Sequence, residues 1–240
     1  MRTLPAFALL LLLQPEAVAQ APGPDPHPTF TVGTATARRG EKAFGEIVVP
    51  PGVDSGYSIA VAVIHGARPG PVLALVSGAH GTEYASIIAL EKLIGQLDPA
   101  TIAGTVIVVP LVNVASFEQK VPHVNPGDRK SMNRFYPGSM SGTVTERASY
   151  LITKQVVEQS DHLIDLHGGD LDENLRPYSY WTVTGDAKQD SVSKAMVLAF
   201  GLDHRTRRRH AASRRSPPKR VMPAPSCRRT STRWSTAAST

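Results

Sequence analysis

Apolar and polar positions alternate with two different periods along the chain, and segments of the two kinds follow one another. Short alternating or unbroken apolar runs predict strands at Thr29–Ala37, Gly45–Val49, Ser58–Ile64, Val72–Val76, Thr105–Val109, Leu163–Leu166 and Tyr178–Thr184. Apolar residues at helical spacing predict helices at Glu83–Leu97, Thr143–Gln159 and Ala187–Phe200. This succession of strands and helices predicts an α/β fold with a largely parallel sheet.

Three local signals refine this prediction. The run Val72–Val76 is apolar without a break, which is typical of a strand that is covered on both faces in a parallel sheet. The glycines and prolines of Gly66–Pro71 predict a turn before that strand. Thr145 is a candidate cap for the helix predicted at Thr143–Gln159.

The first residues have the pattern of an export signal. Met1 and Arg2 give a positive start, an apolar run covers Leu4–Leu13, and Ala17–Ala19 has the small residues of a cleavage site. The apolar run is shorter than the ~20 residues that a helix needs to span a bilayer. We therefore expect residues 1–19 to be removed on export to the periplasm or the medium, with no stable membrane insertion afterwards.

Charge is distributed unevenly along the chain. The formal net charge is +6, but residues 205–240 contain ten Arg and one Lys and neither Asp nor Glu. A nucleic-acid-binding domain would carry its basic residues on a folded face, so we expect no nucleic-acid partner. The single cysteine, Cys227, excludes an internal disulfide framework and a Cys-rich zinc site.

Residue types that bind metals follow two of the predicted strands. His80 and Glu83 come soon after Val72–Val76, and His167 follows Leu163–Leu166. Ligands of α/β proteins bind beyond the carboxyl ends of the strands, and a spacing of three places His80 and Glu83 on one face of a helix start. Two imidazoles and a carboxylate are suitable zinc ligands, and three protein ligands leave a position for water, as in catalytic zinc sites.

A single motif of this kind does not by itself establish a metal site. A His-x-x-Glu pair also occurs where an exposed histidine precedes a glutamate at the start of a helix. Asp165 alternates onto the same side as His167, where it either supports the metal ligand or caps the sheet end. Asn133 and Arg134 offer donors suited to a carboxylate, but they are also compatible with a solvated surface loop. His123, in a nearby loop, is a candidate substrate contact.

The three motifs together resemble the succinylglutamate desuccinylase/aspartoacylase family, which belongs to the zinc carboxypeptidase-like superfamily. They occur in the order Gly-Ala-His80-Gly-Thr-Glu83, Asn133-Arg134-Phe-Tyr-Pro-Gly and Asp165-Leu-His167-Gly. The resemblance implies that His80, Glu83 and His167 hold one Zn²⁺. It further implies that Asn133 and Arg134 hold the carboxylate of the substrate.

The resemblance also implies a mixed sheet between helices and the hydrolysis of N-acyl amino acids or similar small carboxylates, at an amide or ester bond, by zinc-activated water. Members of the family carry a later glutamate, which acts as general base and then as general acid. The last glutamate of this sequence, Glu173, lies only six residues after His167 and in a different context. We therefore assign no catalytic residue, and we expect impaired catalysis and a fold that is incomplete at the C-terminus.

The sequence accordingly divides into four segments. Residues 1–19 are a signal peptide, 20–42 a Pro-rich linker with the strand that leads into the domain, and 43–204 the N-terminal portion of a zinc hydrolase domain. We interpret 205–240 as a disordered tail that is translated out of frame, since its composition cannot supply a core strand or helix. Two other functions stay open: an exported metallocarboxypeptidase that acts on peptides, and a non-enzymatic protein that binds polyanions through the basic tail.

Overall fold

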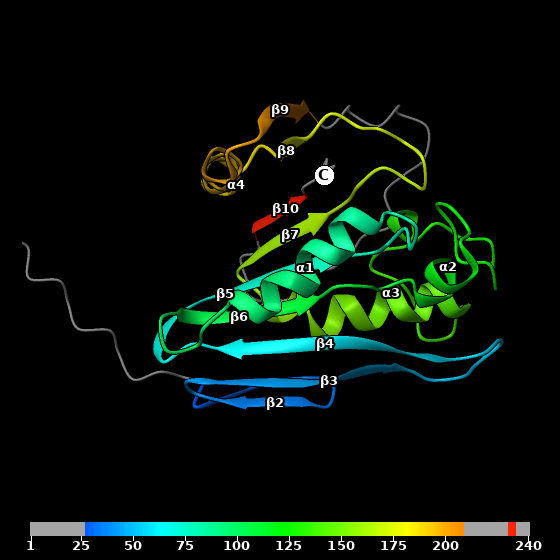
Figure 1. Ribbon diagram of the computed structural model, residues 1–240, viewed down its shortest axis with the longest axis horizontal. Coiled ribbons are helices and arrows are strands. Elements are labelled where there is room, and N and C mark those ends of the chain that lie inside the picture. Colours follow the sequence, from blue (N-terminus) through cyan, green and yellow to red (C-terminus); the bar gives the residue numbers. More distant parts are fainter. Residues whose placement is uncertain (1–26, 209–229, 234–240) are drawn as a thin grey trace, which may run out of the picture.

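The computed structural model describes residues 27–208 and 230–233, which form a mixed sheet with helices on both faces (Figure 1). The predicted signal peptide, residues 1–19, lies outside the described residues, as do residues 20–26 of the linker and residues 209–229 and 234–240. No helix in the described ranges is long and apolar enough to cross a membrane.

The main sheet has the strand order β10-β7-β5-β6-β4-β3 within the described residues. Its strands are β3 (Glu41–Val49), β4 (Tyr57–His65), β5 (Arg68–Ser77), β6 (Ala103–Val109), β7 (His162–Leu166) and β10 (Thr230–Arg233). The pairs from β10 to β6 are parallel, whereas β4 is antiparallel to both β6 and β3. The prediction of a mixed, largely parallel sheet is therefore confirmed.

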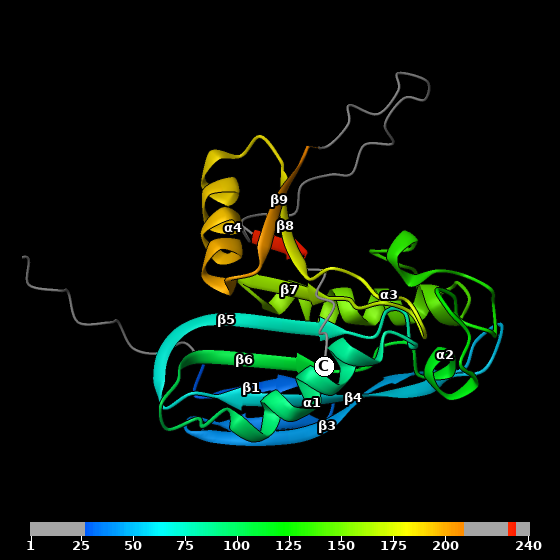
Figure 2. The ribbon, with the colours of Figure 1, turned by 45° about the horizontal axis from the view of Figure 1, so that its top comes forward.

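Two smaller sheets flank the main sheet (Figure 2). The antiparallel hairpin of β1 (Thr29–Val32) and β2 (Ala35–Arg38) lies beside β3. The parallel pair β8 (Tyr178–Val183) and β9 (Asp203–Arg208) is joined through α4 (Ala187–Phe200).

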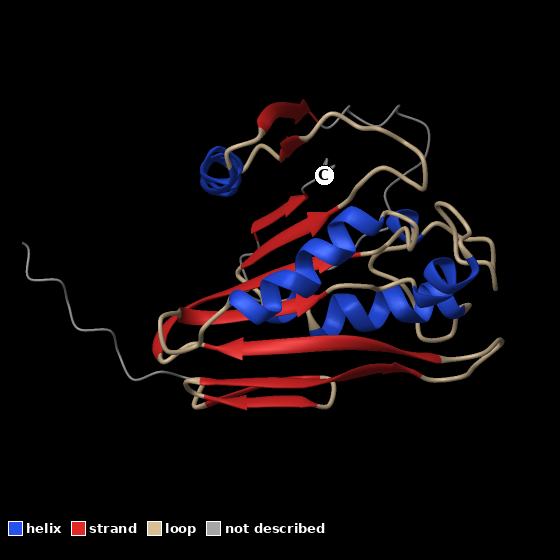
Figure 3. Ribbon diagram, viewed as in Figure 1, coloured by secondary structure: helices blue, strands red, loops and turns tan. Residues whose placement is uncertain are grey.

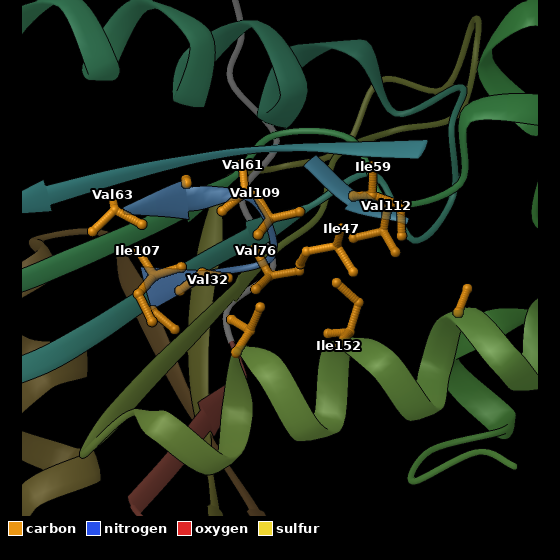
Figure 4. Packing of buried hydrophobic residues seen from close by; sticks show 14 of the residues in the cluster. Val32, Ile47, Ile59, Val61, Val63, Val76, Ile107, Val109, Val112 and Ile152 are labelled. Carbon is orange, nitrogen blue, oxygen red and sulfur yellow. The ribbon is translucent and has the colours of Figure 1, made fainter. Parts of the chain in front are cut away.

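The helices cover both faces of the main sheet (Figure 3). The described α-helices besides α4 are α1 (Tyr84–Gln96), α2 (Val114–Gln119) and α3 (Val144–Gln155), and the 3₁₀ turns are η1 (Met132–Arg134) and η2 (Val157–Gln159). Side chains alternate between two hydrophobic cores along each central strand. In β6, Ile107 and Val109 point to the core shared with α3, and Val106 and Val108 point to the core shared with α1 and α4. Figure 4 shows the first core, where residues of the sheet face Ile152 of α3.

The strand predicted at Thr29–Ala37 is a hairpin in the structure. Its alternation continues across the turn, because Val32 and Ala35 are paired with each other and both are buried, so periodicity alone does not reveal the turn. Gly33 forms the turn at a φ of 56°, and a Cβ atom there would lie 2.1 Å from the carbonyl oxygen of Glu46 on β3. Only glycine fits this close approach.

Two other boundaries differ from the predictions. The predicted turn at Gly66–Pro71 is shorter, because β5 already begins at Arg68 and its register against β6 shifts between Arg68 and Val72. The helix α3 is preceded by Thr143 rather than capped by Thr145. The hydroxyl of Thr145 instead donates to Asp128 at 2.8 Å, and the backbone N–H of Thr143 donates to Glu146 at 3.0 Å.

Strand residues occur in two parts of the segment 205–240, whose composition was expected to supply no core strand or helix. The strand β9 extends to Arg208 and pairs with β8, and β10 pairs in parallel with β7. Both strands contain Thr and Arg in place of aliphatic residues. Backbone hydrogen bonding to a neighbouring strand does not depend on side-chain hydrophobicity, which is why the composition did not predict them.

A buried arginine joins α3 to the loop between β3 and β4. The side chain of Arg147 is 1% exposed, and its guanidinium donates to the carbonyl oxygens of Pro50 at 3.0 Å and Gly142 at 2.7 Å. It also donates to the carboxylate of Asp54 at 2.6 Å and to the carbonyl oxygen of Ser55 at 3.1 Å. Burial opposes ionisation of Asp54, but hydrogen bonds from the backbone N–H of Val144 and from the arginine lower its pKa below the usual value.

Replacing this arginine is expected to destabilise the fold. The Arg147→Met variant should lose about 3–5 kcal/mol in the free energy of unfolding, because it leaves Asp54 and several carbonyl groups without their buried partner. Lys154→Met is the matched control on the same helix, since Lys154 is 45% exposed and pairs with Glu158 at the surface. It should cost less than about 1 kcal/mol. Equal losses for the two variants in urea denaturation would contradict the assigned role of Arg147.

Candidate metal centre

Three side chains from two strand ends converge at one edge of the main sheet. The strands β5 and β7 are parallel neighbours, with Ser77 paired to Leu166, so the chain leaves both strands at the same edge. His80 lies in the loop after β5, Glu83 directly precedes α1, and His167 directly follows β7. One potential ligand atom of each of these three residues lies within 4.8 Å of the others. The structure therefore brings together the three residues that the sequence singled out.

The carboxylate of Glu83 is at the centre of this group. Its Oε1 atom lies 2.7 Å from Nδ1 of His80, and its Oε2 atom lies 2.7 Å from Nδ1 of His167. The backbone N–H of Gly168 donates to Oε2 at 3.1 Å. Glu83 is 5% exposed, so water contributes little to its solvation. Both imidazoles thus direct the same ring nitrogen toward one buried carboxylate.

Electrostatics within the group favour an ionised carboxylate and a basic imidazole. Burial raises the pKa of Glu83, but the hydrogen bonds from His167 and His80 outweigh this effect and lower it to about 2. Burial has the opposite effect on an imidazole and lowers the pKa of His167. The charge of Asp165 and the hydrogen bonds to Asp165 and Glu83 nevertheless raise this pKa to about 10. A cation is therefore favoured between these groups, and a metal ion would replace a proton there.

The outer ring nitrogens of both histidines face further side chains. Nε2 of His167 lies 3.3 Å from Oδ2 of Asp165, and Nε2 of His80 lies 3.2 Å from Nδ2 of Asn133. Asp165 therefore lies behind His167 and contacts its ring. Of the two roles that the sequence left open, support of His167 and capping of the sheet end, the structure favours the first. A carboxylate in this position fixes the ring orientation of a metal-binding histidine and raises its basicity.

The turn η1 presents its two polar residues differently. Asn133 is half-buried and reaches His80, whereas Arg134 is exposed. Within the described residues, the guanidinium of Arg134 forms no hydrogen bond or ion pair. Its planar set of donors is therefore available to a carboxylate ligand.

A second pair of residues lies beside the first group. Nδ1 of His123 is 2.7 Å from Oδ2 of Asp170, and the ring of His123 stands edge-on to that of His80, with 5.3 Å between centroids. Asp170 is buried and accepts a hydrogen bond from the hydroxyl of Thr82. Sequence reasoning considered His123 as a substrate contact but assigned no role to Asp170. The only signal for Asp170 was its position in the loop after the second histidine.

Glu173 has a structural task in the same loop. Its carboxylate accepts a hydrogen bond from the backbone N–H of Asp170 at 3.1 Å. This contact closes the turn after β7.

The short helix α2 supports the loop that carries His80. The backbone N–H of Gly81 donates to Oγ of Ser116 at 2.9 Å, and the amide of Asn113 donates to the carbonyl oxygen of Ala79 at 3.3 Å. A Cβ atom on Gly81 would lie 2.3 Å from the backbone nitrogen of Phe117, so only glycine permits this contact. Six residues are too few to give a clear helical period, and the sequence analysis accordingly missed α2.

Known proteins resemble this chain in sequence. The sequence model of the succinylglutamate desuccinylase/aspartoacylase catalytic domain matches residues 69–219. The N-alpha-acetyl-L-2,4-diaminobutyric acid deacetylase of Halomonas elongata is 32% identical over 161 residues, which make up 67% of this chain and 44% of that enzyme. The chain thus spans less than half the length of this relative.

Solved structures show the same fold. An aspartoacylase family protein from Mesorhizobium loti aligns with a TM-score of 0.64 and 28% identity, over 75% of this chain and 55% of that protein. A metallo-carboxypeptidase from Burkholderia cenocepacia aligns with a TM-score of 0.50 and 16% identity, over 68% of this chain and 48% of that protein. The second likeness concerns the fold alone and confirms the expected carboxypeptidase-like architecture. From the matched catalytic-domain model, the chain belongs to the succinylglutamate desuccinylase/aspartoacylase family.

Proposed function

We propose that the chain carries the zinc site of a deacylase that cleaves the acyl amide or ester bond of a small carboxylate-bearing substrate. The observation that carries this proposal is the convergence of His80, Glu83 and His167 at the carboxyl ends of two adjacent parallel strands. Membership of a family named for the removal of acyl groups from amino acids supports it. The relative from Halomonas elongata, named as a deacetylase of an acetylated amino acid, supports the same substrate class.

The donor set of the site fits zinc. Two imidazole nitrogens and one carboxylate oxygen are the three protein ligands typical of catalytic zinc sites, and Asp165 stands behind one of the imidazoles. When bound there, zinc would polarise the acyl carbonyl and activate a water molecule. His80, Glu83 and His167 would hold the ion, and their buried surroundings limit competition from solvent.

The remaining groups at the rim bind and orient the substrate in this proposal. Arg134 holds the substrate carboxylate through paired, charge-assisted hydrogen bonds, with Asn133 beside it. His123, held by Asp170, presents its imidazole at the same rim, where it can hydrogen-bond to the substrate. The carboxylate of Glu173 accepts a hydrogen bond from a backbone N–H in the loop after β7, and we assign it no part in proton transfer at the reacting bond. We propose that hydrolysis is slow for this reason, since a general acid–base contributes about 10²–10⁴-fold.

The metal site predicts a stoichiometric zinc content. The purified chain should contain about one zinc ion per molecule, measured by mass spectrometry of the metal, and the Glu83→Gln variant should lose it, because the amide removes the central charge between the two histidines. Glu158→Gln is the matched control, since Glu158 pairs with Lys154 at the surface of α3. It should keep the zinc. Zinc retained by Glu83→Gln would contradict the proposed ligand set.

The role of Arg134 predicts dependence on the substrate's carboxylate. Arg134→Ala should weaken binding of an N-acetyl amino acid by about 10–100-fold, because a hydrogen bond to a charged group contributes about 1.5–3 kcal/mol. The same variant should bind the C-terminal amide of that compound as well as the unaltered chain does. Isothermal titration of both compounds separates these outcomes.

An equal loss for both compounds would mean that Arg134 acts on the fold and not on the carboxylate. Release of C-terminal residues from peptides, without turnover of N-acyl amino acids, would instead identify a metallocarboxypeptidase.

A further inference from the structure

The outer nitrogen of His80 has an unusual environment for a metal-binding imidazole. Nδ1 of this residue faces Glu83 and is therefore the atom directed at the metal position. Nε2 faces Nδ2 of Asn133 at 3.2 Å, and Oγ of Ser131 lies at 3.5 Å. The role of this nitrogen depends on the metal site of the proposed function.

The position of the proton on the imidazole of His80 determines which atom of the Asn133 amide must face Nε2. A neutral imidazole has one N–H and one lone pair, so a ring that gives its Nδ1 lone pair to a cation carries its proton on Nε2. That proton needs an acceptor, which an amide nitrogen cannot be. The amide oxygen of Asn133 is the suitable group, and in the described residues this buried atom has no hydrogen-bond partner. A half-turn of the amide exchanges two atoms of similar size and places the oxygen on Nε2.

We propose that Asn133 is a positioning residue for the metal ligand His80. Its amide oxygen accepts the proton of Nε2, which fixes the ring in the tautomer that leaves Nδ1 free for the metal. The arrangement parallels that of His167, whose Nε2 lies 3.3 Å from Asp165. The two ligands therefore have outer partners at similar distances, one neutral and one charged.

With this assignment, the adjacent residues Asn133 and Arg134 of η1 have different roles. The sequence resemblance implied that Asn133 and Arg134 hold the substrate carboxylate together. In the structure Asn133 is half-buried against His80, and Arg134 is exposed. The carboxylate of the substrate is then held mainly by Arg134, and the oxygen of Asn133 is committed to the metal ligand.

Zinc affinity tests the proposal without relying on activity. We would measure the dissociation constant of Zn²⁺ by competition with a chelator for the unaltered chain and for Asn133→Leu, Asn133→Asp and Ser131→Ala. Asn133→Leu should weaken zinc binding by about 10–100-fold, as expected for loss of an outer partner of a ligand. Asn133→Asp should restore it, because a carboxylate accepts the same proton. Ser131→Ala should leave it unchanged.

Nuclear magnetic resonance of the zinc-loaded chain labelled with ¹⁵N-histidine provides a second readout. The Nε2 proton of His80 should be observed in the unaltered chain and in Asn133→Asp, and it should exchange faster with solvent in Asn133→Leu. A merely structural role for Asn133 would not change this proton selectively over that of His167.

The outcomes separate this inference from the proposed function. Zinc that is lost in Glu83→Gln but bound with unchanged affinity by Asn133→Leu would overturn the positioning role and leave the metal site intact. Weak binding by both Asn133 variants would show that the amide acts as a donor, which also overturns it. A full loss in Ser131→Ala would assign the role to the serine. No zinc on the unaltered chain would overturn the metal site itself and this inference with it.

Discussion

The parallel pairing of β5 with β7 is the constraint on which the site depends. Because Ser77 is paired with Leu166, both strands end at one edge of the sheet, and residues separated by more than 80 positions in the sequence meet there. Each strand is held in place by side chains on both of its faces, so its end has little freedom to shift. The polar groups at this edge are therefore positioned by hydrophobic packing several residues away. In α/β proteins the strand interiors typically form the core and the residues beyond the strand ends form the site.

The buried carboxylate of Glu83 connects the fold to the chemistry. Its charge is compensated by His80, His167 and the N–H of Gly168, which come from both strand ends. A buried charge that loses its partners is strongly destabilising, so the arrangement that suits a cation also helps to fasten the loop after β5 to the loop after β7. Local structure, stability and the proposed metal binding consequently depend on the same few contacts.

Sequence periodicity predicted the parts of this molecule that are buried on both faces, including β5 and β6, since short unbroken apolar runs are typical of strands inside a parallel sheet. It also located His80, Glu83 and His167, because they directly follow such strands or lie at helical spacing. It failed where contacts link two irregular segments, as between Asn133 and His80 or His123 and Asp170. Such contacts leave no period in the sequence, and the same holds for strands such as β10, which the periodicity did not predict and which pairs with β7.

The unequal outer partners of the two histidines have a consequence for the charge of the site. Glu83 and Asp165 together carry two negative charges, so a divalent cation would leave the group close to neutral. A second carboxylate behind His80 would make the loaded site negative and would reduce the pull of the metal on an acyl oxygen. A neutral amide can orient the ring without adding that charge. The presence of asparagine at position 133 is therefore physically consistent with the proposed zinc site.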